Sequence, residues 1–280
     1  MIKALDGHTV EPRFDWYQFS TTADLKILRE VLEPMAANEP FTDTKPVLTG
    51  YAWSTVIGGV GGSVRVQWGG RNGDQYGANV QGTGPLSPQV ADLIRAAGLP
   101  HKVGRADVCL DFIGPFDQCR LRFIERCNTA GMESRDNGSC PESTSQNGRT
   151  VYGGAVSSFY RPTLYEKGRQ LGPDHPVDFL RLEHRFAPTK SAEKAQLSEL
   201  SPAQMIGCRP VARELSQVIA EYAAAPHKLT KQSKENTPYY WMLRQYRRLL
   251  VEMHQDHGSW PAVGAQIGLD LADIEEELRT

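Results

Sequence analysis

Two aspartates, Asp107 and Asp111, stand four positions apart in the run RADVCLDF at 105–112. If this run is a β-strand, its side chains alternate between two faces, so both aspartates and Cys109 project together. Two carboxylates on one face repel each other unless a cation lies between them, and oxygen ligands suit Mg²⁺ or Mn²⁺. The alternative is that one aspartate simply ends the strand in water.

A second run, RLEHRF at 181–186, places a carboxylate between two arginines. The same alternation puts Arg181, Glu183 and Arg185 on one face of a strand. This pattern is compatible with a site that binds phosphate or metal. It is equally typical of a salt-bridged sheet face in contact with solvent.

A third run, TVYGGAVSSFYRPTLYEKG at 150–168, contains a tyrosine followed by an acid and a lysine. In an extended segment, Thr163, Tyr165 and Lys167 share a face. A tyrosine hydroxyl has a pKa near 10 and needs a nearby cation or general base to act as a nucleophile. Lys167 or a bound metal could supply that activation. The alternative is that Tyr165 is a half-buried aromatic of the sheet.

In this order, the three runs resemble the replication initiation factor family. That family includes the trans-acting initiators of rolling-circle plasmids and the replication initiators of filamentous phages. The matching pattern is R-x-D-x-x-x-D, then a tyrosine before Glu-Lys, then R-x-E, and FDWYQF at 14–19 is similar to the family's first strand. The resemblance covers roughly residues 12–187.

The resemblance implies a metal-dependent enzyme that nicks origin DNA and later closes the strand. Tyr165 would attack the phosphodiester, leaving a 5′-phosphotyrosine link and a free 3′-OH, and Lys167 would assist. Asp107, Asp111 and Glu183 would hold Mg²⁺ or Mn²⁺. This chain has a threonine two positions before Tyr165, where the family pattern has an arginine, so Arg161 is the candidate for that phosphate contact.

Basic residues are the expected contacts to DNA phosphates. The predicted DNA-binding residues are Arg105, Arg161, Arg181, Arg185, Lys228, Lys231, Arg244, Arg247 and Arg248. Residues 227–248 carry six basic residues against one glutamate, together with aromatic residues. This stretch is therefore interpreted either as an origin-binding helix or as a solvated surface.

The last segment, 260–278, has two short helical patterns around Gly268 and could form a helix-turn-helix. Its second half is strongly acidic, which is unfavourable for a helix in a DNA groove. We therefore expect this tail to pack against the protein or contact a partner.

Three other functions are compatible with the same residues. A DNA-binding regulator would use the C-terminal helices without a metal or a covalent adduct. A metal-dependent nuclease would use the carboxylates with water as the nucleophile. A degenerate family member with a structural role is disfavoured because Asp107, Glu183 and Tyr165 are all present.

Strand-like runs at 12–20, 63–70, 103–114, 149–168 and 177–186 alternate with helical patterns at 24–36, 85–100 and 117–130. These elements predict an α+β fold with a mainly antiparallel sheet, flanking helices and βαβ-type halves. From residue 191 onward the pattern is helical. We therefore expect a catalytic domain at 1–190 and a helical region at 191–280.

The composition is that of an ordinary globular protein: 280 residues, 40% hydrophobic and 23% charged, with a net charge of −2. The five cysteines form no CxxC pair, which argues against a zinc site or disulfide framework and fits a cytoplasmic location. No signal peptide or membrane span is predicted. The expected partners are single-stranded and double-stranded origin DNA, a host helicase and polymerase, and a second copy of the chain.

Overall fold

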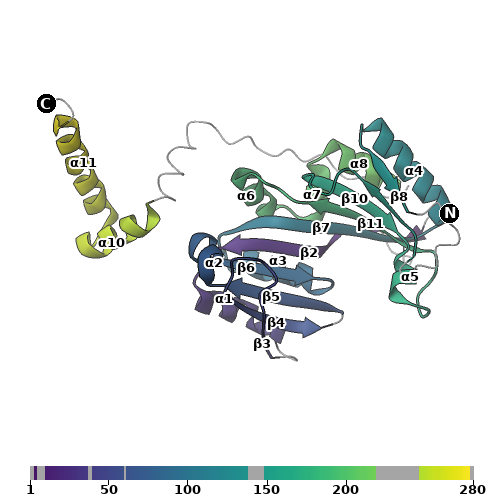
Figure 1. Cartoon of the computed structure of the whole chain (residues 1–280), viewed down its shortest axis with the longest axis horizontal. Coiled ribbons are helices and arrows are strands. Elements are labelled where there is room, and N and C mark those ends of the chain that lie inside the picture. Colours follow the sequence, from purple (N-terminus) through teal and green to yellow (C-terminus); the bar gives the residue numbers. More distant parts are fainter. Residues whose placement is uncertain are drawn as a thin grey trace. The chain divides into compact units, whose positions relative to one another are not determined.

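The computed structural model describes residues 3–4, 10–36, 40–59, 61–137, 148–218 and 246–277 (Figure 1). The chain divides into two compact units, Met1–Leu229 and Thr230–Thr280. The first unit contains the sheet and all three motif strands. The described residues of the second form two helices, α10 and α11.

The first unit is built on one sheet in which all the pairings between described strands are antiparallel. The strands are β1 Lys3–Ala4, β2 Arg13–Thr21, β3 Thr42–Thr44, β4 Trp53–Gly59, β5 Gly62–Trp68, β6 Ala78–Thr83, β7 His101–Ile113, β8 Ser134–Asp136, β9 Thr150–Gly153, β10 Tyr160–Tyr165 and β11 Phe179–Phe186. Their order is β3-β4-β5-β6-β2-β7-β11-β10-β9-β8, and β1 pairs with β7.

Helices connect and cover these strands. They are α1 Leu25–Leu32, the 3₁₀ helix η1 Glu33–Ala36, α2 Gly70–Tyr76, α3 Leu86–Ala96, α4 Phe116–Thr129, α5 Lys167–Leu171, α6 Ser191–Glu199, α7 Pro202–Gly207, α8 Pro210–Ser216, α10 Arg247–His257 and α11 Trp260–Glu277. Local capping defines several ends. Asp24 accepts a hydrogen bond from the Lys26 amide at the start of α1, and Ser201 and Gln204 form a capping box at α7.

The predicted βαβ-type halves are present in split form. Strands β6 and β7 run in the same direction on either side of β2 and are joined through α3. Helix α4 then joins β7 to β8, which again run in the same direction. The α+β class and the mainly antiparallel sheet are therefore confirmed.

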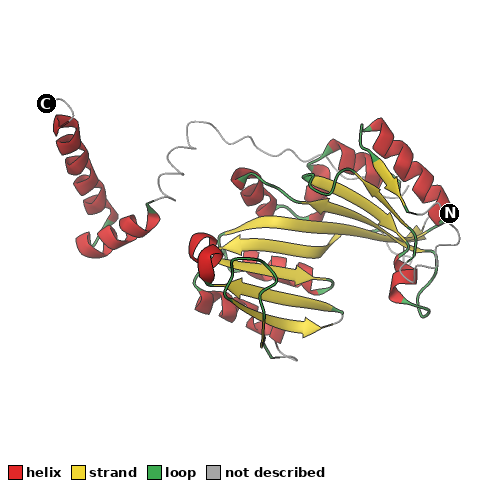
Figure 2. Cartoon of the chain, in the orientation of Figure 1, coloured by secondary structure: helices red, strands yellow, loops and turns green. Residues whose placement is uncertain are grey.

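One face of the sheet packs against helices, and this packing forms the core (Figure 2). The alternate side chains of the long strand β7, namely Val108, Leu110 and Phe112, are fully buried there. Side chains from α1, α3, α4, α6, α7 and α8 belong to the same apolar cluster. We call the opposite face, which carries Asp107, Cys109 and Asp111, the uncovered face. None of the six helices just named packs on it.

Helices α6 to α8 belong to the same compact unit as the sheet, although composition placed a boundary near residue 190. They pack on the sheet because their apolar residues complete the core; Leu197, Met205, Ile206 and Leu215 are fully buried. The compact unit therefore includes these three helices.

The C-terminal segment differs from the expected helix-turn-helix. A single helix, α11, continues through Gly268, because glycine inside a helix costs only about 1 kcal/mol relative to alanine. The turn lies earlier, at Gly258, which has a left-handed conformation and ends α10. Among the described helices, none combines the length and apolar character needed to cross a membrane.

Candidate functional site

The three motif strands β10, β11 and β7 are neighbours, so their uncovered-face side chains form rows across the sheet. From β10 to β7 the rows are Tyr165–Arg181–Asp111, Thr163–Glu183–Cys109 and Arg161–Arg185–Asp107. Facing side chains in such rows have Cβ atoms about 4.5–5.5 Å apart. The shared faces expected from alternation are therefore confirmed for the strand residues, and the register brings the three motifs together on one face of the sheet. Lys167 was expected on the same extended face as Tyr165, but β10 ends at Tyr165 and Lys167 begins helix α5.

Arg181 and Asp111 form the centre of a buried ion network. The guanidinium Nε of Arg181 lies 2.6 Å from Asp111 Oδ1, and its Nη2 lies 2.9 Å from Oδ2. Arg181 also contacts Asp15 at 2.8 Å, and Arg13 donates to Asp111 at 2.7 Å. Burial raises the pKa of Asp111, but the two arginines outweigh it and hold that pKa below its usual value.

Asp107 and Glu183 lie one row apart on adjacent strands and share arginine partners. Arg105 binds Asp107 through Nε at 3.0 Å, and Arg185 lies 3.4 Å from Asp107 and 3.7 Å from Glu183. Burial, together with the charge of Asp107, raises the pKa of Glu183 to about 7. The arginines therefore do not fully compensate this pair of carboxylates.

Tyr165 is the last residue of β10 and is half-buried on the uncovered face. Burial raises the pKa of its phenol, and the charge of Arg181 opposes that shift only in part. Lys167 begins α5, and its ammonium lies 5.8 Å from the centre of the Tyr165 ring. Burial and then the charge of Arg181 lower the pKa of Lys167. The ammonium donates to Gln170 at 2.8 Å, and its lowered pKa makes Lys167 the candidate to accept the phenol proton.

Two predicted DNA-binding arginines on the uncovered face stack on aromatic rings. The Arg105 guanidinium lies 4.2 Å from the centre of the Trp16 ring, and that of Arg161 lies 4.6 Å from the Tyr152 ring. The buried Nε of Arg161 has no hydrogen-bond partner among the described residues. A buried donor without a hydrogen-bond partner destabilises the fold, and a bound ligand that accepts the bond removes this cost.

Sequence reasoning did not identify the residue that fixes the end of β10. The Glu166 side chain is 3% exposed. It accepts a hydrogen bond from the backbone amide of Arg149 at 2.8 Å and another from the guanidinium Nη2 of Arg149 at 2.9 Å. Burial raises the pKa of Glu166, but Arg149 holds it below the usual value. The acid after the tyrosine in the motif was the available signal, because a buried carboxylate requires a partner.

The predicted metal ligands differ in their availability. Within the described residues, no group of three or more His, Cys, Asp or Glu side chains is placed to hold a metal ion. Asp111 has both oxygens occupied by arginines. Arg105 likewise contacts both oxygens of Asp107, so a cation bound there would displace that arginine. The pair Asp107 and Glu183 is still the better candidate, because burial and the charge of Asp107 raise the pKa of Glu183. Mg²⁺ usually takes one or two protein carboxylates and completes its shell with water and substrate phosphate. A cation near this pair would also relieve the repulsion that raises the Glu183 pKa.

The other predicted DNA contacts belong to the C-terminal unit. Lys228, Lys231 and Arg244 lie outside the described residues. Arg247 and Arg248 begin α10, and the 93% exposed Arg248 pairs with Glu252 at 2.9 Å.

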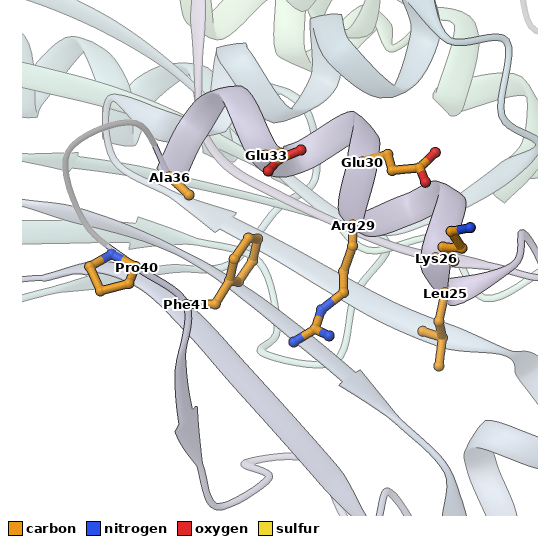
Figure 3. A pocket seen from close by; sticks show the side chains of 8 residues that line it. All are labelled: Leu25, Lys26, Arg29, Glu30, Glu33, Ala36, Pro40 and Phe41. Carbon is orange, nitrogen blue, oxygen red and sulfur yellow. The ribbon is translucent and has the colours of Figure 1, made fainter.

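A pocket elsewhere in the sheet unit is formed by α1, η1 and the segment before β3 (Figure 3). Its lining residues are Leu25, Lys26, Arg29, Glu30, Glu33, Ala36, Pro40 and Phe41. The Arg29 guanidinium lies 5.9 Å from the Phe41 ring. The pocket contains no residue of the three motifs, so it is separate from the candidate site.

No protein-family model matches this chain, and no curated protein sequence matches it. Its fold is similar to that of a rolling circle replication initiator protein from Geobacillus stearothermophilus. The two structures share 19% sequence identity with a TM-score of 0.52, and the match covers 83% of this chain and 100% of the other. At this identity the likeness establishes a common fold.

Proposed function

We propose that this chain initiates rolling-circle replication by nicking DNA with Tyr165. The observation that carries the proposal is the row Tyr165–Arg181–Asp111 on the uncovered face, next to the rows that hold Glu183 and Asp107. A phenol, cations and carboxylates from three distant motifs thus meet on one face of the sheet, where Tyr165 is half-buried and Arg181 and Asp107 are buried. The likeness in fold to a replication initiator supports the same conclusion.

In the proposed reaction the Tyr165 oxygen attacks the phosphorus of a DNA phosphodiester. The bond from phosphorus to the 3′ oxygen breaks, so the downstream 5′ phosphate is joined to the tyrosine and the upstream strand ends in a 3′-OH. The phenol proton passes to Lys167, whose lowered pKa favours the neutral, accepting form. Because the phosphotyrosine keeps the ester bond, attack by a 3′-OH can reverse the step and close the strand.

Arginines two rows from Tyr165 on the same face of the sheet would bind and orient the DNA phosphates at the nick. Arg161 is the strongest candidate, since its Nε is buried without a hydrogen-bond partner among the described residues. Arg185 lies beside it in the same row. Charge-assisted hydrogen bonds from such groups stabilise the additional negative charge of the transition state.

Asp107 and Glu183 are the residues that would hold Mg²⁺ or Mn²⁺. When bound, the cation would supply further charge stabilisation at the phosphate. Asp111 is assigned instead to holding Arg181 in place beside Tyr165, because both of its oxygens accept hydrogen bonds from arginines.

The test is covalent capture of single-stranded DNA of random sequence in the presence of Mn²⁺. DNA labelled at its 3′ end should yield labelled protein on a denaturing gel, whereas 5′-labelled DNA should yield a shortened fragment that a polymerase can extend. We expect Tyr165→Phe to lower adduct formation at least about 10³-fold, since it removes the attacking oxygen. Tyr152→Phe is the matched control, because this tyrosine lies on the neighbouring strand β9 and is also half-buried.

Each competing function predicts a different result in this assay. Cleavage without labelled protein, unaffected by Tyr165→Phe, would identify a nuclease that uses water. Binding without cleavage in Mg²⁺ or Mn²⁺ would identify a DNA-binding regulator. Adduct formation that persists in Tyr165→Phe and disappears in Tyr152→Phe would move the nucleophile to Tyr152.

A further inference from the structure

A line of polar side chains continues from the candidate site across the other half of the uncovered face. The register pairs Arg105 of β7 with Gln18 of β2, Gln18 with Gln81 of β6, and Gln81 with Arg65 of β5. We call these four residues the polar row. With neighbouring strands about 4.8 Å apart, the row extends roughly 14 Å from β7 toward the edge of the sheet.

The end of the polar row nearest the site offers a flat stacking surface. The Arg105 guanidinium lies on the Trp16 ring at 4.2 Å, and Trp16 is paired in register with Asp107. Both side chains are partly accessible; that of Arg105 is 29% exposed. Unstacked bases pack on aromatic rings and on guanidinium planes.

The middle of the polar row consists of side-chain amides linked by long hydrogen bonds. The Trp16 indole donates to Gln18 Oε1 at 3.3 Å, and Gln18 Nε2 donates to Asn79 Oδ1 at 3.4 Å. Gln81 lies next to them on β6 and is half-buried. Amides can both donate and accept, so these groups can exchange weak internal bonds for the edges of bases.

The far end of the polar row carries a cation bound only by neutral oxygens. Arg65 Nη1 donates to Thr44 Oγ1 at 2.9 Å, to Ser54 Oγ at 3.2 Å and to the Lys45 carbonyl at 3.3 Å. Strands β4, β5 and β6 contain no aspartate or glutamate. This half of the face therefore combines positive charge with neutral hydrogen-bonding groups, which suits a phosphate backbone.

From these observations we infer that the polar row, with Trp16, binds the single-stranded DNA that flanks the nick. The identity of the bound strand, as the one that is nicked, rests on the proposed function. A base stacks at Trp16 and Arg105, the amides of Gln18 and Gln81 contact base edges, and Arg65 contacts a phosphate farther along. The strand thereby leaves the phosphate at Tyr165 in a fixed direction across the sheet.

The experiment is fluorescence anisotropy with a labelled mixed-sequence DNA strand of about 16 nucleotides, the upper end of site sizes for single-strand-binding sheet domains. EDTA is present, so no cleavage occurs. We expect Trp16→Ala to weaken binding about tenfold. We expect Arg65→Gln to weaken it severalfold and to reduce the salt dependence by about one phosphate contact.

The matched control is Trp53→Ala. Trp53 is 63% exposed on β4, and it precedes Ser54, which bonds Arg65 on the uncovered face, so alternation places Trp53 on the other side of the sheet. This control should bind the strand as the unmodified chain does. Thermal unfolding of each variant checks that the fold is retained.

A second measurement does not depend on any variant. A strand containing 5-iododeoxyuridine, irradiated in complex with the unmodified chain, should cross-link to Trp16 or to another residue of β2. Cross-links confined to segments outside β2, β5, β6 and β7 would overturn the inference, as would unmodified affinity in both Trp16→Ala and Arg65→Gln.

The binding and nicking results can be separated. Binding that depends on Trp16, without adduct formation on any strand, would support the polar row and reject the nicking proposal. Adduct formation with unmodified strand affinity in both variants would support nicking by Tyr165 and reject the polar row.

Discussion

Strands β7, β11 and β10 and strands β2, β6 and β5 are built alike on the helix-covered face and differently on the uncovered one. In both halves the covered face is mainly apolar and buried, as with Leu110 and Val80. On the uncovered face, the first half holds charges in pairs, with Arg181 bound to Asp111. The second half carries Gln18, Gln81 and other neutral groups, together with Arg65, whose partners are neutral oxygens.

The difference indicates that the half with paired charges suits catalysis and the half with neutral amides suits strand binding. Buried charges require partners, so the first half is a connected network whose members fix one another's positions. Such a network can hold a phenol and a phosphate in a defined geometry. Neutral amides lose little free energy when they change partners, so the second half can accept a strand of variable sequence.

The largest effect on stability should come from removing the buried guanidinium of Arg181. Arg181→Met leaves Asp111 and Asp15 without their main partner, and we expect the free energy of unfolding to fall by about 3–5 kcal/mol. Urea denaturation measures it. We expect adduct formation to fall as well under conditions where the variant is folded, because Arg181 lies in the same row as Tyr165.

The matched change on strands β2, β6 and β5 is Arg65→Met. The partners of Arg65 are neutral oxygens, so we expect the free energy of unfolding to fall by only about 1 kcal/mol. Equal losses for the two variants would contradict the distinction between a charged and a neutral half.

A change at Glu183 should have a smaller effect, and one that depends on pH. The pKa of Glu183 is raised to about 7 in the folded state, so the stability associated with its protonated form is present at low pH and is lost as pH rises through about 7. In EDTA we therefore expect Glu183→Gln to be about 1–3 kcal/mol more stable than the unmodified chain at pH 8, and equally stable at pH 5.

Divalent cations provide the complementary measurement. Mg²⁺ or Mn²⁺ at pH 8 should raise the unfolding temperature of the unmodified chain and have little effect on Glu183→Gln, because only the folded carboxylate pair binds the ion. An equal rise in both proteins would exclude Glu183 as a ligand.

Of the changes at Arg181, Glu183 and Glu166, we expect the one at Glu166 to have the smallest effect on stability. Glu166→Gln turns an amide group toward the donors of Arg149, which should cost about 1–2 kcal/mol. It should also lower the rate of adduct formation without changing strand affinity, since the end of β10 would hold Tyr165 less firmly. Single-turnover kinetics and anisotropy measure the two quantities.

The control for that prediction is Glu214→Gln. Glu214 is 58% exposed and pairs with Arg126 at 3.2 Å on the helical side, so its loss should change stability by no more than about 0.5 kcal/mol. A fall in adduct rate for this variant as large as that for Glu166→Gln would remove the assigned role of Glu166.

Much of the fold was predictable, because alternation and helical periodicity are local properties. The pattern in RADVCLDF and RLEHRF correctly separated the apolar residues, such as Leu110 and Leu182, from the charged residues between them. The C-terminal segment was harder to predict, since Gly268 is compatible with either a turn or a helix and only the continuation of α11 resolves it. The conformational preference at Gly268 is weak, so the helical residues on both sides determine its conformation.

The candidate site was predictable only in part. Tyr165, Arg181 and Glu183 could be grouped from their motifs, but two further members of the ion network come from strand β2. Arg13, which donates to Asp111, lies 98 positions away in the sequence, and Asp15, which pairs with Arg181, lies at a register shift in β2. A pattern on one strand does not reveal what the facing strand presents, so the ion pairing of Asp111 could not be anticipated.

By itself, the sequence determined which residues of each strand share a face and which face is apolar, because backbone geometry fixes the direction of successive side chains. Only the tertiary structure decided which strands are neighbours and in what register. The strand pairing places Tyr165 beside Arg181 and pairs Asp111 with two arginines. It also brings Asp107 and Glu183 together with a repulsion that their arginines do not fully offset. Pairing depends on contacts between residues far apart in the chain, and the free energy of those contacts is not encoded in any single segment.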